Sequence, residues 1–169
     1  MFRYWDYCMC FFLTEEEEEL YGFKKKKKFL YCSFLWDVHC IVISKTKAKK
    51  LTKNHNIEDK DERKRIENIG GVIYDEKIYG QENLTRAFDM FNLKQYRISC
   101  IPETVKISLS PLEQYIIIGT KGVFDSLTDG DLHNIYNNSE SIETIIQNIV
   151  QNCINRFTRE NLGIIAIKL

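Results

Sequence analysis

The segment that decides the fold runs from Tyr115 to Leu127 and reads YIIIGTKGVFDSL. Its first part is a run of aromatic and β-branched residues, which is typical of a buried strand. The two glycines on either side of Thr120 and Lys121 favour a tight turn. We therefore expect a buried strand that leads through a tight turn into a short helix.

Further strands and helices are predicted on both sides of this segment. Apolar runs bounded by Gly, Pro or polar residues indicate strands, and longer charged or periodic segments indicate helices. Antiparallel strands followed by helices are typical of an α+β fold. The expected strands are residues 30–35, 40–43, 105–109 and 162–169, the expected short hairpin pairs 72–74 with 77–79, and the expected helices are 58–68 and 142–157.

The clearest predicted helix covers residues 142–157. Its apolar residues recur every three or four positions, as on one buried face of an amphipathic helix. Ser141 is a suitable N-cap for this helix, and Thr128 with Asp131 forms a capping-box pattern for a shorter helix before it. The apolar positions are Ile142, Ile145, Ile146, Ile149, Val150, Cys153, Ile154 and Phe157.

Charge divides the chain into two parts. Residues 15–19 are five Glu and residues 24–28 are five Lys, and such blocks are usually solvated. We expect residues 1–28 to be a poorly ordered, low-complexity segment and residues 29–169 to form the domain. The whole chain of 169 residues has 24 basic and 24 acidic residues, so neither a nucleic-acid nor a membrane partner is expected.

The cysteine pattern bears on the compartment. The chain has six cysteines, none in a C-x-x-C pair or with zinc-ligand spacing to a histidine. Reduced thiols favour the cytoplasm or the nucleus. The apolar N-terminus is short and has no small-residue cleavage site, so a signal peptide is not expected.

Several segments carry motifs in a consistent order. The deciding segment contains Lys121-Gly122, and residues 30–43 read LYCSFLWDVHCIVI, with Trp36-Asp37 at its centre. Together the motifs resemble the metal-dependent protein phosphatases of the 2C type, the PPM family. That family has a D-G turn at the position of Lys121-Gly122 and a G-D pair at the position of Trp36-Asp37. The other matching segments are LTKNH at 51–55, ERKRIENIGGVI at 62–73, LTRAF at 84–88, IPE at 101–103 and TRENLGIIAI at 158–167.

The resemblance implies both a fold and an activity. The family folds as an αββα sandwich of two antiparallel sheets flanked by helices, and this chain would supply its later portion as a partial sandwich. The family's enzymes hydrolyse phosphoserine and phosphothreonine. Two Mg²⁺ or Mn²⁺ ions held by carboxylates activate a bridging water in that reaction.

The resemblance also identifies positions that hold metal ligands in the family. Lys121 occupies the D-G position and is not expected to bind, because an ammonium group only donates hydrogen bonds. Glu160 occupies the D-N position and keeps a carboxylate. Met90 replaces the Asp of the family's G-D pair, and Asp89 lies one residue out of register. Glu160 and Asp89 are therefore the remaining metal candidates.

The family's earlier ligand motifs, E-D and D-G-H-G-G, have no counterpart here. Gly22 is the only glycine before Gly70, which excludes a diverged form of the glycine-rich loop within this sequence. We expect no secure catalytic residue and no bound cofactor. Mg²⁺ or Mn²⁺ is expected if the family's activity is retained.

The other motif residues receive structural interpretations. Asp125 is expected to stabilise the turn or cap a helix, and Arg86 to tie strands together through hydrogen bonds. His55 is expected to pair with backbone groups. Gly122 and Asn161 belong to the turn and loop motifs, as Asp37 belongs to the first hairpin.

Three hypotheses for the function remain open. The first is a catalytically impaired pseudophosphatase with a binding or regulatory role, whose partner would be a protein or phosphoprotein. The second is an active Mg²⁺- or Mn²⁺-dependent serine/threonine phosphatase that receives its missing ligands from other sequence or a partner. The third is a truncated product whose exposed sheet edges favour aggregation.

Overall fold

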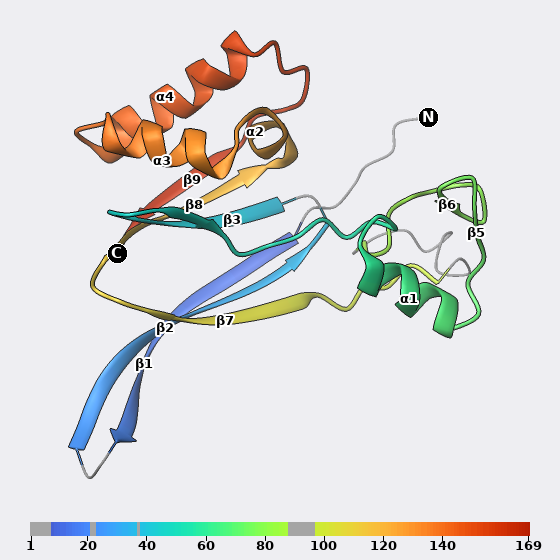
Figure 1. Ribbon diagram of the computed structural model, residues 1–169, viewed down its shortest axis with the longest axis horizontal. Helices are drawn as coiled ribbons and strands as arrows, with labels where there is room; N and C mark the ends of the chain where they lie inside the picture. The colour runs from blue at the N-terminus through green and yellow to red at the C-terminus, as the bar shows by residue number, and fades with distance from the viewer. Residues whose placement is uncertain (1–7, 21–22, 37, 88–96) are drawn as a thin grey trace. The chain divides into compact units, whose positions relative to one another are not determined.

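The computed structural model describes residues 8–20, 23–36, 38–87 and 97–169 (Figure 1). No helix in these ranges is long and apolar enough to cross a lipid bilayer. The strands are β1 (Cys8–Leu20), β2 (Phe23–Leu35), β3 (Val38–Ser44), β4 (Ala48–Lys50), β5 (Ile73–Tyr74), β6 (Lys77–Ile78), β7 (Glu103–Leu109), β8 (Glu113–Thr120) and β9 (Ile164–Lys168). The helices are α1 (Lys60–Asn68), α2 (Lys121–Ser126), α3 (Asp129–Asn137) and α4 (Ile142–Asn155).

These elements form an α+β fold, as predicted. One sheet has the strand order β4-β3-β8-β9, with antiparallel pairing throughout, and another has the order β1-β2-β7. The chain divides into two compact units. Among the described residues, the α1 unit comprises 8–10, 33–36, 53–87 and 97–104, and the helix–sheet unit comprises 11–20, 23–32, 38–52 and 105–169.

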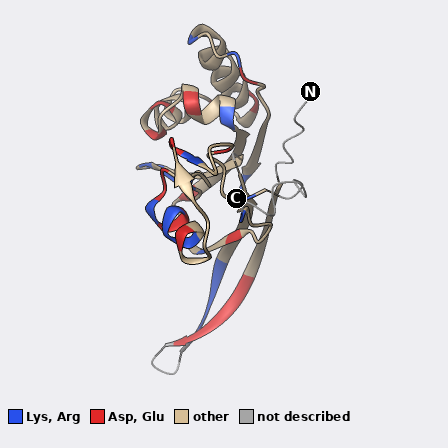
Figure 2. Cartoon of the chain, turned by 90° about the vertical axis from the view of Figure 1, so that its right-hand side faces the viewer, with Lys and Arg blue, Asp and Glu red and all other residues tan. Residues whose placement is uncertain are grey.

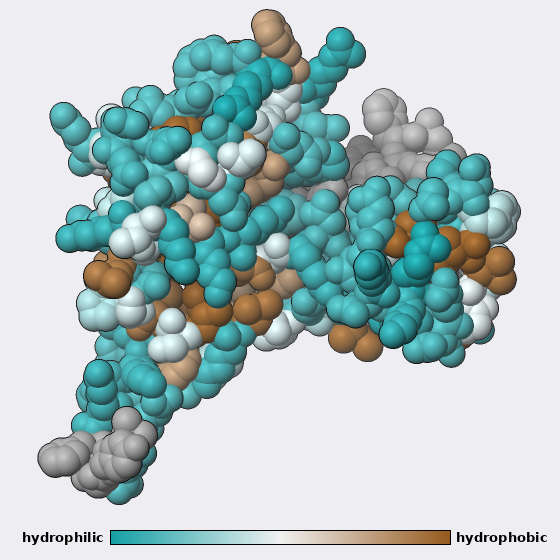
Figure 3. Space-filling model, in the orientation of Figure 1, coloured by the Kyte–Doolittle hydropathy of each residue, from teal (hydrophilic) through white to brown (hydrophobic). Residues whose placement is uncertain are grey.

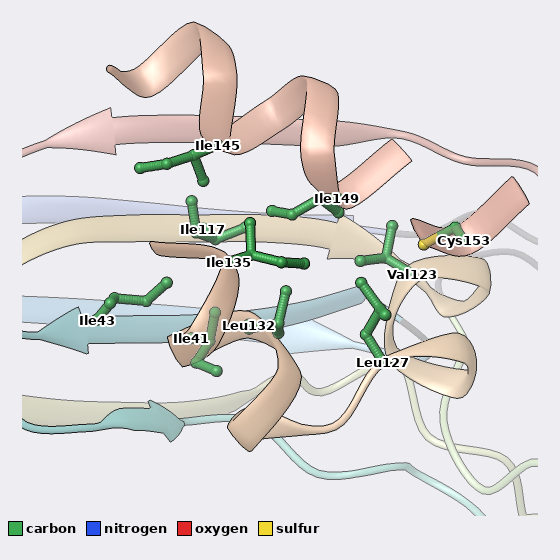
Figure 4. Close-up of a cluster of buried hydrophobic side chains, with 10 residues drawn as sticks. All are labelled: Ile41, Ile43, Ile117, Val123, Leu127, Leu132, Ile135, Ile145, Ile149 and Cys153. Carbon is green, nitrogen blue, oxygen red and sulfur yellow. The ribbon is translucent and has the colours of Figure 1, made fainter. Parts of the chain in front are cut away.

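The core of the helix–sheet unit lies between the β4-β3-β8-β9 sheet and the helices α2, α3 and α4 (Figure 4). Alternate residues of a strand point to the same face, so Ile41, Ile43 and Ile117 all face the helices. Ile145 and Ile149 of α4 are at most 1% exposed in this core. The apolar periodicity of α4 thus predicts its buried face in part, since Ile154 and Phe157, which the same periodicity assigns to this face, are 54% and 88% exposed.

The ends of α3 and α4 follow the predicted capping. Thr128 and Asp131 form a capping box at the start of α3, and Ser141 forms another with Thr144 at the start of α4. The helix α4 ends at Asn155, two residues before the predicted end. Phe157 adopts a left-handed φ of 57°, which a helix does not continue through.

The N-terminal part of the chain differs from the expectation. Residues 1–28 are predicted to be poorly ordered, but residues 8–20 and 23–35 form the neighbouring strands β1 and β2. The Glu and Lys blocks lie on these two strands (Figure 2). Lys24 Nζ lies 3.5 Å from Glu17 Oε2, and Lys27 pairs with Glu18. Opposite charges across two strands stabilise their pairing, so the two blocks support a sheet here.

Contacts with β7 extend this sheet. Glu16 on β1 accepts hydrogen bonds from the Tyr31 hydroxyl at 2.7 Å and from Lys106 Nζ at 2.8 Å. The Lys106 ammonium also lies 4.2 Å from the centre of the Phe29 ring, which is a cation–π distance. Local sequence could not reveal these contacts, because Glu16 and Lys106 are 90 positions apart.

The α1 unit has a small core of its own. Ile57, Ile66 and Ile78 are at most 1% exposed and pack together with Leu84. Asp59 caps α1 by accepting hydrogen bonds from the backbone N–H groups of Asp61 and Glu62, so the helix begins two residues later than predicted. The predicted hairpin forms as β5 and β6.

Candidate functional site

The deciding segment forms the predicted strand, turn and helix. Strand β8 ends at Thr120, and α2 begins at the next residue, Lys121. The buried part of β8 pairs with β3 on one side and with β9 on the other. The end of β8 is therefore held on both edges, and this fixes the position of the first turn of α2.

A loop that precedes β9 is tied to this turn by three hydrogen bonds. The Thr120 hydroxyl donates to the Asn161 carbonyl at 2.7 Å and accepts from the Gly163 N–H at 3.1 Å. The Thr120 N–H donates to the Gly163 carbonyl at 3.0 Å. These bonds bring the D-N-like segment of the sequence against the D-G-like segment.

The residue 158–163 loop lies so close to the first turn of α2 that position 122 requires glycine. A Cβ atom at Gly122 would lie 2.9 Å from the Glu160 Cβ and 2.9 Å from the Asn161 carbonyl oxygen. Both distances are shorter than a Cβ normally tolerates, so only glycine fits without movement of the loop. The structure thus brings together Gly122, Glu160 and Asn161, which the sequence assigns to two separate motifs.

The charged side chains at this site are exposed. Lys121 Nζ pairs with the Asp125 carboxylate one helical turn later, and the two side chains are 39% and 47% exposed. Glu160 is also exposed, and its backbone N–H donates to Thr158 Oγ1 at 3.4 Å. The site therefore presents an ammonium group paired with the Asp125 carboxylate at the surface.

These residues do not fit a Mg²⁺ or Mn²⁺ ion. Hard divalent ions take several oxygen ligands, and the ammonium of Lys121 offers none. Among the residues that the structure describes, no group of three His, Cys, Asp or Glu side chains could hold a metal. Two other candidate positions, Asp37 and Asp89, lie outside the described residues.

A second polar cluster lies in the α1 unit and is buried. Glu62 is 2% exposed, and its Oε1 accepts hydrogen bonds from Arg86 Nε at 3.0 Å and Arg86 Nη2 at 2.6 Å. Arg65 Nη2 donates to Glu62 Oε2 at 3.0 Å. Arg86 also donates to the Ile101 carbonyl, and Arg65 to the Thr85 carbonyl. Arg86 thus connects distant segments of this unit.

The ionisation of Glu62 follows from these contacts. Burial alone would raise the pKa of this carboxyl group. The hydrogen bonds that it accepts, chiefly those from Arg86, have a larger effect and lower the pKa to about 2. The sequence interpretation names Arg86 without its partner. The partner could have been found from the helix spacing. Glu62 lies four positions before the buried Ile66, and this spacing places Glu62 on the buried face of α1.

His55 supports the turn after β2 in the same unit. It is fully buried, stacks on Phe34, and its Nδ1 accepts a hydrogen bond from the Trp36 N–H at 3.1 Å. Nε2 therefore carries the proton of the neutral ring and faces Glu103 Oε2 at 3.3 Å. Burial and the nearby charge of Arg86 lower the pKa of His55. Trp36 itself has a left-handed φ of 61°, which is strained for a residue with a side chain.

A comparison with known protein families accounts for the order of the sequence motifs. The family model described as "Protein phosphatase 2C" matches residues 20–162. The chain belongs to the protein phosphatase 2C family. The resemblance inferred from the sequence motifs is therefore confirmed.

Individual protein phosphatase 2C relatives are distant. The chain is similar to "Probable protein phosphatase 2C 21" of Arabidopsis thaliana, with 25% identity over 141 residues, covering 76% of this chain and 40% of the relative. "Probable protein phosphatase 2C 2" of Paramecium tetraurelia is 27% identical over 114 residues, covering 63% of this chain and 38% of the relative. The chain thus spans about two fifths of the length of these relatives.

Solved structures show the same fold. A phosphatase from Toxoplasma gondii matches with a TM-score of 0.68 at 23% identity, covering 84% of this chain and 44% of the other. A structure described as a C. elegans sex determining protein matches with a TM-score of 0.71 at 21% identity, covering 86% of this chain and 40% of the other. The α+β arrangement of antiparallel sheets and helices is therefore that of the protein phosphatase 2C fold.

Proposed function

We propose that this chain is a catalytically impaired protein phosphatase 2C-like protein that acts by binding a protein or phosphoprotein. The observation that supports this proposal is Lys121 at the first position of α2, paired with Asp125. The family resemblance implies a metal-binding carboxylate at this position. A cation there repels a divalent ion, and pairing with Asp125 engages the carboxylate one helical turn away.

The backbone around Lys121 supports a binding role. The hydrogen bonds of Thr120 and the close contact at Gly122 keep the α2 turn and the residue 158–163 loop together. An ordered surface turn with an exposed ammonium group suits recognition of a negatively charged segment. The proposed role thus uses the positive charge of Lys121 in place of the charge of a metal.

An alternative is an active Mg²⁺- or Mn²⁺-dependent serine/threonine phosphatase. Family membership and the retained carboxylate of Glu160 favour this second candidate. It requires ligands from sequence outside this chain or from a partner, since the described residues alone do not fit the metal. It also requires Lys121 to be tolerated beside the ions.

The test is hydrolysis of p-nitrophenyl phosphate and of a phosphothreonine peptide by the purified chain across a Mn²⁺ titration. We expect no metal-dependent turnover from the wild type or from Lys121→Asp, because one restored carboxylate does not complete a two-metal site. Glu160→Gln is the control, since it should abolish any turnover that belongs to this site. Turnover that rises with Mn²⁺, survives repurification and is lost in Glu160→Gln would overturn the proposal.

Co-expression with a family segment that carries the D-G-H-G-G loop tests the alternative. Mn²⁺-dependent turnover that appears only with this segment would establish the active phosphatase. If the chain and this segment form a complex that shows no gain in turnover, the active phosphatase is ruled out.

A further inference from the structure

A small polar cavity lies between the helices α3 and α4 and has no part in the Lys121 site. Its volume is about 250 Å³, which suits the end of one side chain better than a drug-sized ligand. Both helices belong to the helix–sheet unit. The lining is mostly carboxamides and consists of Asp131, Asn134, Ile135 and Asn138 from α3 and its C-cap, and Asn148 and Asn152 from α4.

Three of these carboxamides use their nitrogen atoms within the protein. Asn138 Nδ2 donates to the Asn134 carbonyl at 2.8 Å, and Asn152 Nδ2 donates to the Asn148 carbonyl at 2.8 Å. Asn148 Nδ2 donates to Ser139 Oγ at 3.0 Å, and the Ser139 hydroxyl donates in turn to a backbone carbonyl of α3 at 2.7 Å. Each partner is an acceptor, so these contacts fix which end of each carboxamide is the nitrogen.

The oxygen atoms of the same three carboxamides are unused. In the part of the chain that the structure describes, no hydrogen bond reaches Oδ1 of Asn138, Asn148 or Asn152. A carboxamide oxygen has two lone pairs that accept hydrogen bonds. The cavity therefore offers acceptors, and a matching ligand is a hydrogen-bond donor.

The charges of the two helices favour a positively charged donor. Residues 129–155, which include both helices, contain no Lys or Arg. The acidic residues of this stretch are Asp129, Asp131, Glu140 and Glu143. Arg156 follows the stretch and pairs with Asp131 at 2.9 Å, so these two charges offset each other. The other carboxylates leave the stretch negative, and a negative surface attracts cations.

Other cations of the unit lie outside the cavity lining. Strand β4 packs against α3 and carries Lys49 and Lys50, but neither lysine lines the cavity. The surface over α3 and α4 is largely hydrophilic (Figure 3). This surface suits a polar contact better than an apolar peptide face.

A divalent metal ion does not fit these donors. Ca²⁺ and Mg²⁺ are usually bound through carboxylates. The one carboxylate of the lining, Asp131, accepts hydrogen bonds from Thr128 and from Arg156. The remaining oxygens are neutral, so an organic cation matches them better than a metal.

We propose that the α3–α4 cavity binds the lysine side chain of a protein partner. The ammonium group has three donors that match separate oxygens, whereas the guanidinium fork of arginine suits the paired oxygens of one carboxylate. Ile135 is 9% exposed and gives the cavity an apolar surface, against which the methylene stem of a lysine packs. This inference names the chemistry of a partner for the proposed binding role and rests on that role.

The experiment follows the side-chain amide signals of the cavity asparagines by NMR while a peptide is added to the whole chain. The probes are a short Gly-Ser peptide with blocked ends and one central lysine, the same peptide with acetyl-lysine, and the same peptide with arginine. We expect the lysine peptide to shift the signals of Asn138, Asn148 and Asn152. The acetyl-lysine peptide should leave them unchanged, because acetylation removes the charge.

Two peptide results would contradict the assignment. Equal shifts with the acetyl-lysine peptide would overturn the cation, because a neutral donor would then be sufficient. Tighter binding of the arginine peptide than of the lysine peptide would overturn the choice of lysine.

The test variant is Asn148→Ala with Asn152→Ala, which removes two of the three oxygens. We expect it to bind the lysine peptide about fivefold more weakly than the wild type, since each hydrogen bond contributes modestly. Asn148→Asp should bind about threefold more tightly, because a carboxylate accepts from an ammonium group more strongly than a carboxamide does. The Asn138 signal reports binding in both variants, and thermal melting verifies that each is folded.

The matched control is Gln147→Ala with Gln151→Ala. These exposed carboxamides precede Asn148 and Asn152 by one position each and do not line the cavity, so binding should be unchanged. Equal weakening in both double variants would overturn the cavity assignment, because it would reflect a general change in α4.

The outcomes separate this inference from the proposed function. Failure of the lysine peptide to shift the asparagine signals would overturn the cavity assignment and leave the proposed role of Lys121 intact. Weaker binding in the asparagine variant alone, together with Mn²⁺-dependent turnover in the phosphatase assay, would support the cavity and overturn the impaired-phosphatase proposal.

Discussion

Two polar clusters, both built from residues of the protein phosphatase 2C motifs, differ in burial. Glu62, Arg65 and Arg86 form a cluster around a carboxylate that is 2% exposed. Lys121, Asp125 and Glu160 lie at the surface, where the Lys121 and Asp125 side chains are 39% and 47% exposed. The buried cluster retains the residues of the family pattern, and the exposed one departs from it.

The difference follows from what each cluster does for folding. Removing one partner of a buried ion pair leaves an uncompensated charge without water, which strongly destabilises the protein. An exposed ion pair contributes little, because water and salt screen its charges. The buried cluster is therefore expected to contribute much more to the stability of the fold than the exposed one.

The largest effect should come from the buried cluster. Glu62→Gln leaves the guanidinium groups of Arg65 and Arg86 without their shared carboxylate, and we expect a loss of about 3 kcal/mol in the free energy of unfolding. Urea denaturation measures this loss. Glu67→Gln on the same helix is the control, since Glu67 is exposed and should change stability by less than about 0.5 kcal/mol. Similar losses in both variants would contradict the comparison.

The same cluster predicts a pH dependence of stability. The pKa of Glu62 falls from 4.5 to about 2 on folding, so its contribution is complete above pH 4.5 and is lost as the pH falls toward 2. The difference corresponds to about 3 kcal/mol. Unfolding measured between pH 6 and pH 2 should show a shallower decline for Glu62→Gln than for the wild type. Parallel curves would show that other carboxyl groups account for the acid sensitivity.

An intermediate effect is expected at the backbone of the exposed site. Gly122→Ala places a Cβ 2.9 Å from both Glu160 Cβ and the Asn161 carbonyl, so the loop must move. We expect a loss of about 1–3 kcal/mol in urea denaturation. Gly130→Ala is the control, because its Cβ would meet only Thr128 Oγ1 at 3.7 Å, and it should be neutral or stabilising by up to about 1 kcal/mol. Equal stability of the two variants would show that the residue 158–163 loop is held less closely than described.

The smallest effect should come from the exposed ion pair itself. A double-mutant cycle with Lys121→Ala and Asp125→Ala should give a coupling of about 0.3–0.5 kcal/mol. The order of charges is unfavourable, since a cation lies at the positive end of the helix dipole. Thermal unfolding at low and high salt measures the coupling and its screening. A coupling above about 2 kcal/mol would contradict the interpretation that this exposed pair contributes little to stability.

Much of the fold can be predicted from local sequence signals. The periodic apolar residues of α4 and the caps at Thr128 and Ser141 lie next to the elements that they define, so they are readable in a single sequence. The segment from Tyr115 to Leu127 likewise predicts its strand, turn and helix. The order of the motifs predicts the family, because each short motif is weak alone but the whole set in this order is specific.

Contacts between distant residues account for most of what sequence alone does not predict. The strands β1 and β2 resemble solvated charge blocks until their opposite charges are paired in space. The closeness of Gly122 to Glu160 depends on the loop that joins α4 to β9, and no local pattern encodes that distance. The assignments of Asp37 and Asp89 remain predictions, since both lie outside the described residues.

The uniform Glu and Lys runs have a consequence for how this region can change in length. Within each run, neighbouring positions carry the same side chain, so slipping the strands by two residues places the same charges opposite each other again. Charge alone therefore leaves the alignment degenerate, and the buried end of β2, which includes Leu30, Cys32 and Phe34, must fix it. Inserting equal numbers of residues into both runs lengthens the ribbon without moving this buried end. Changes in the length of β1 and β2 within these runs are therefore expected to leave the packing of Leu30, Cys32 and Phe34 unchanged.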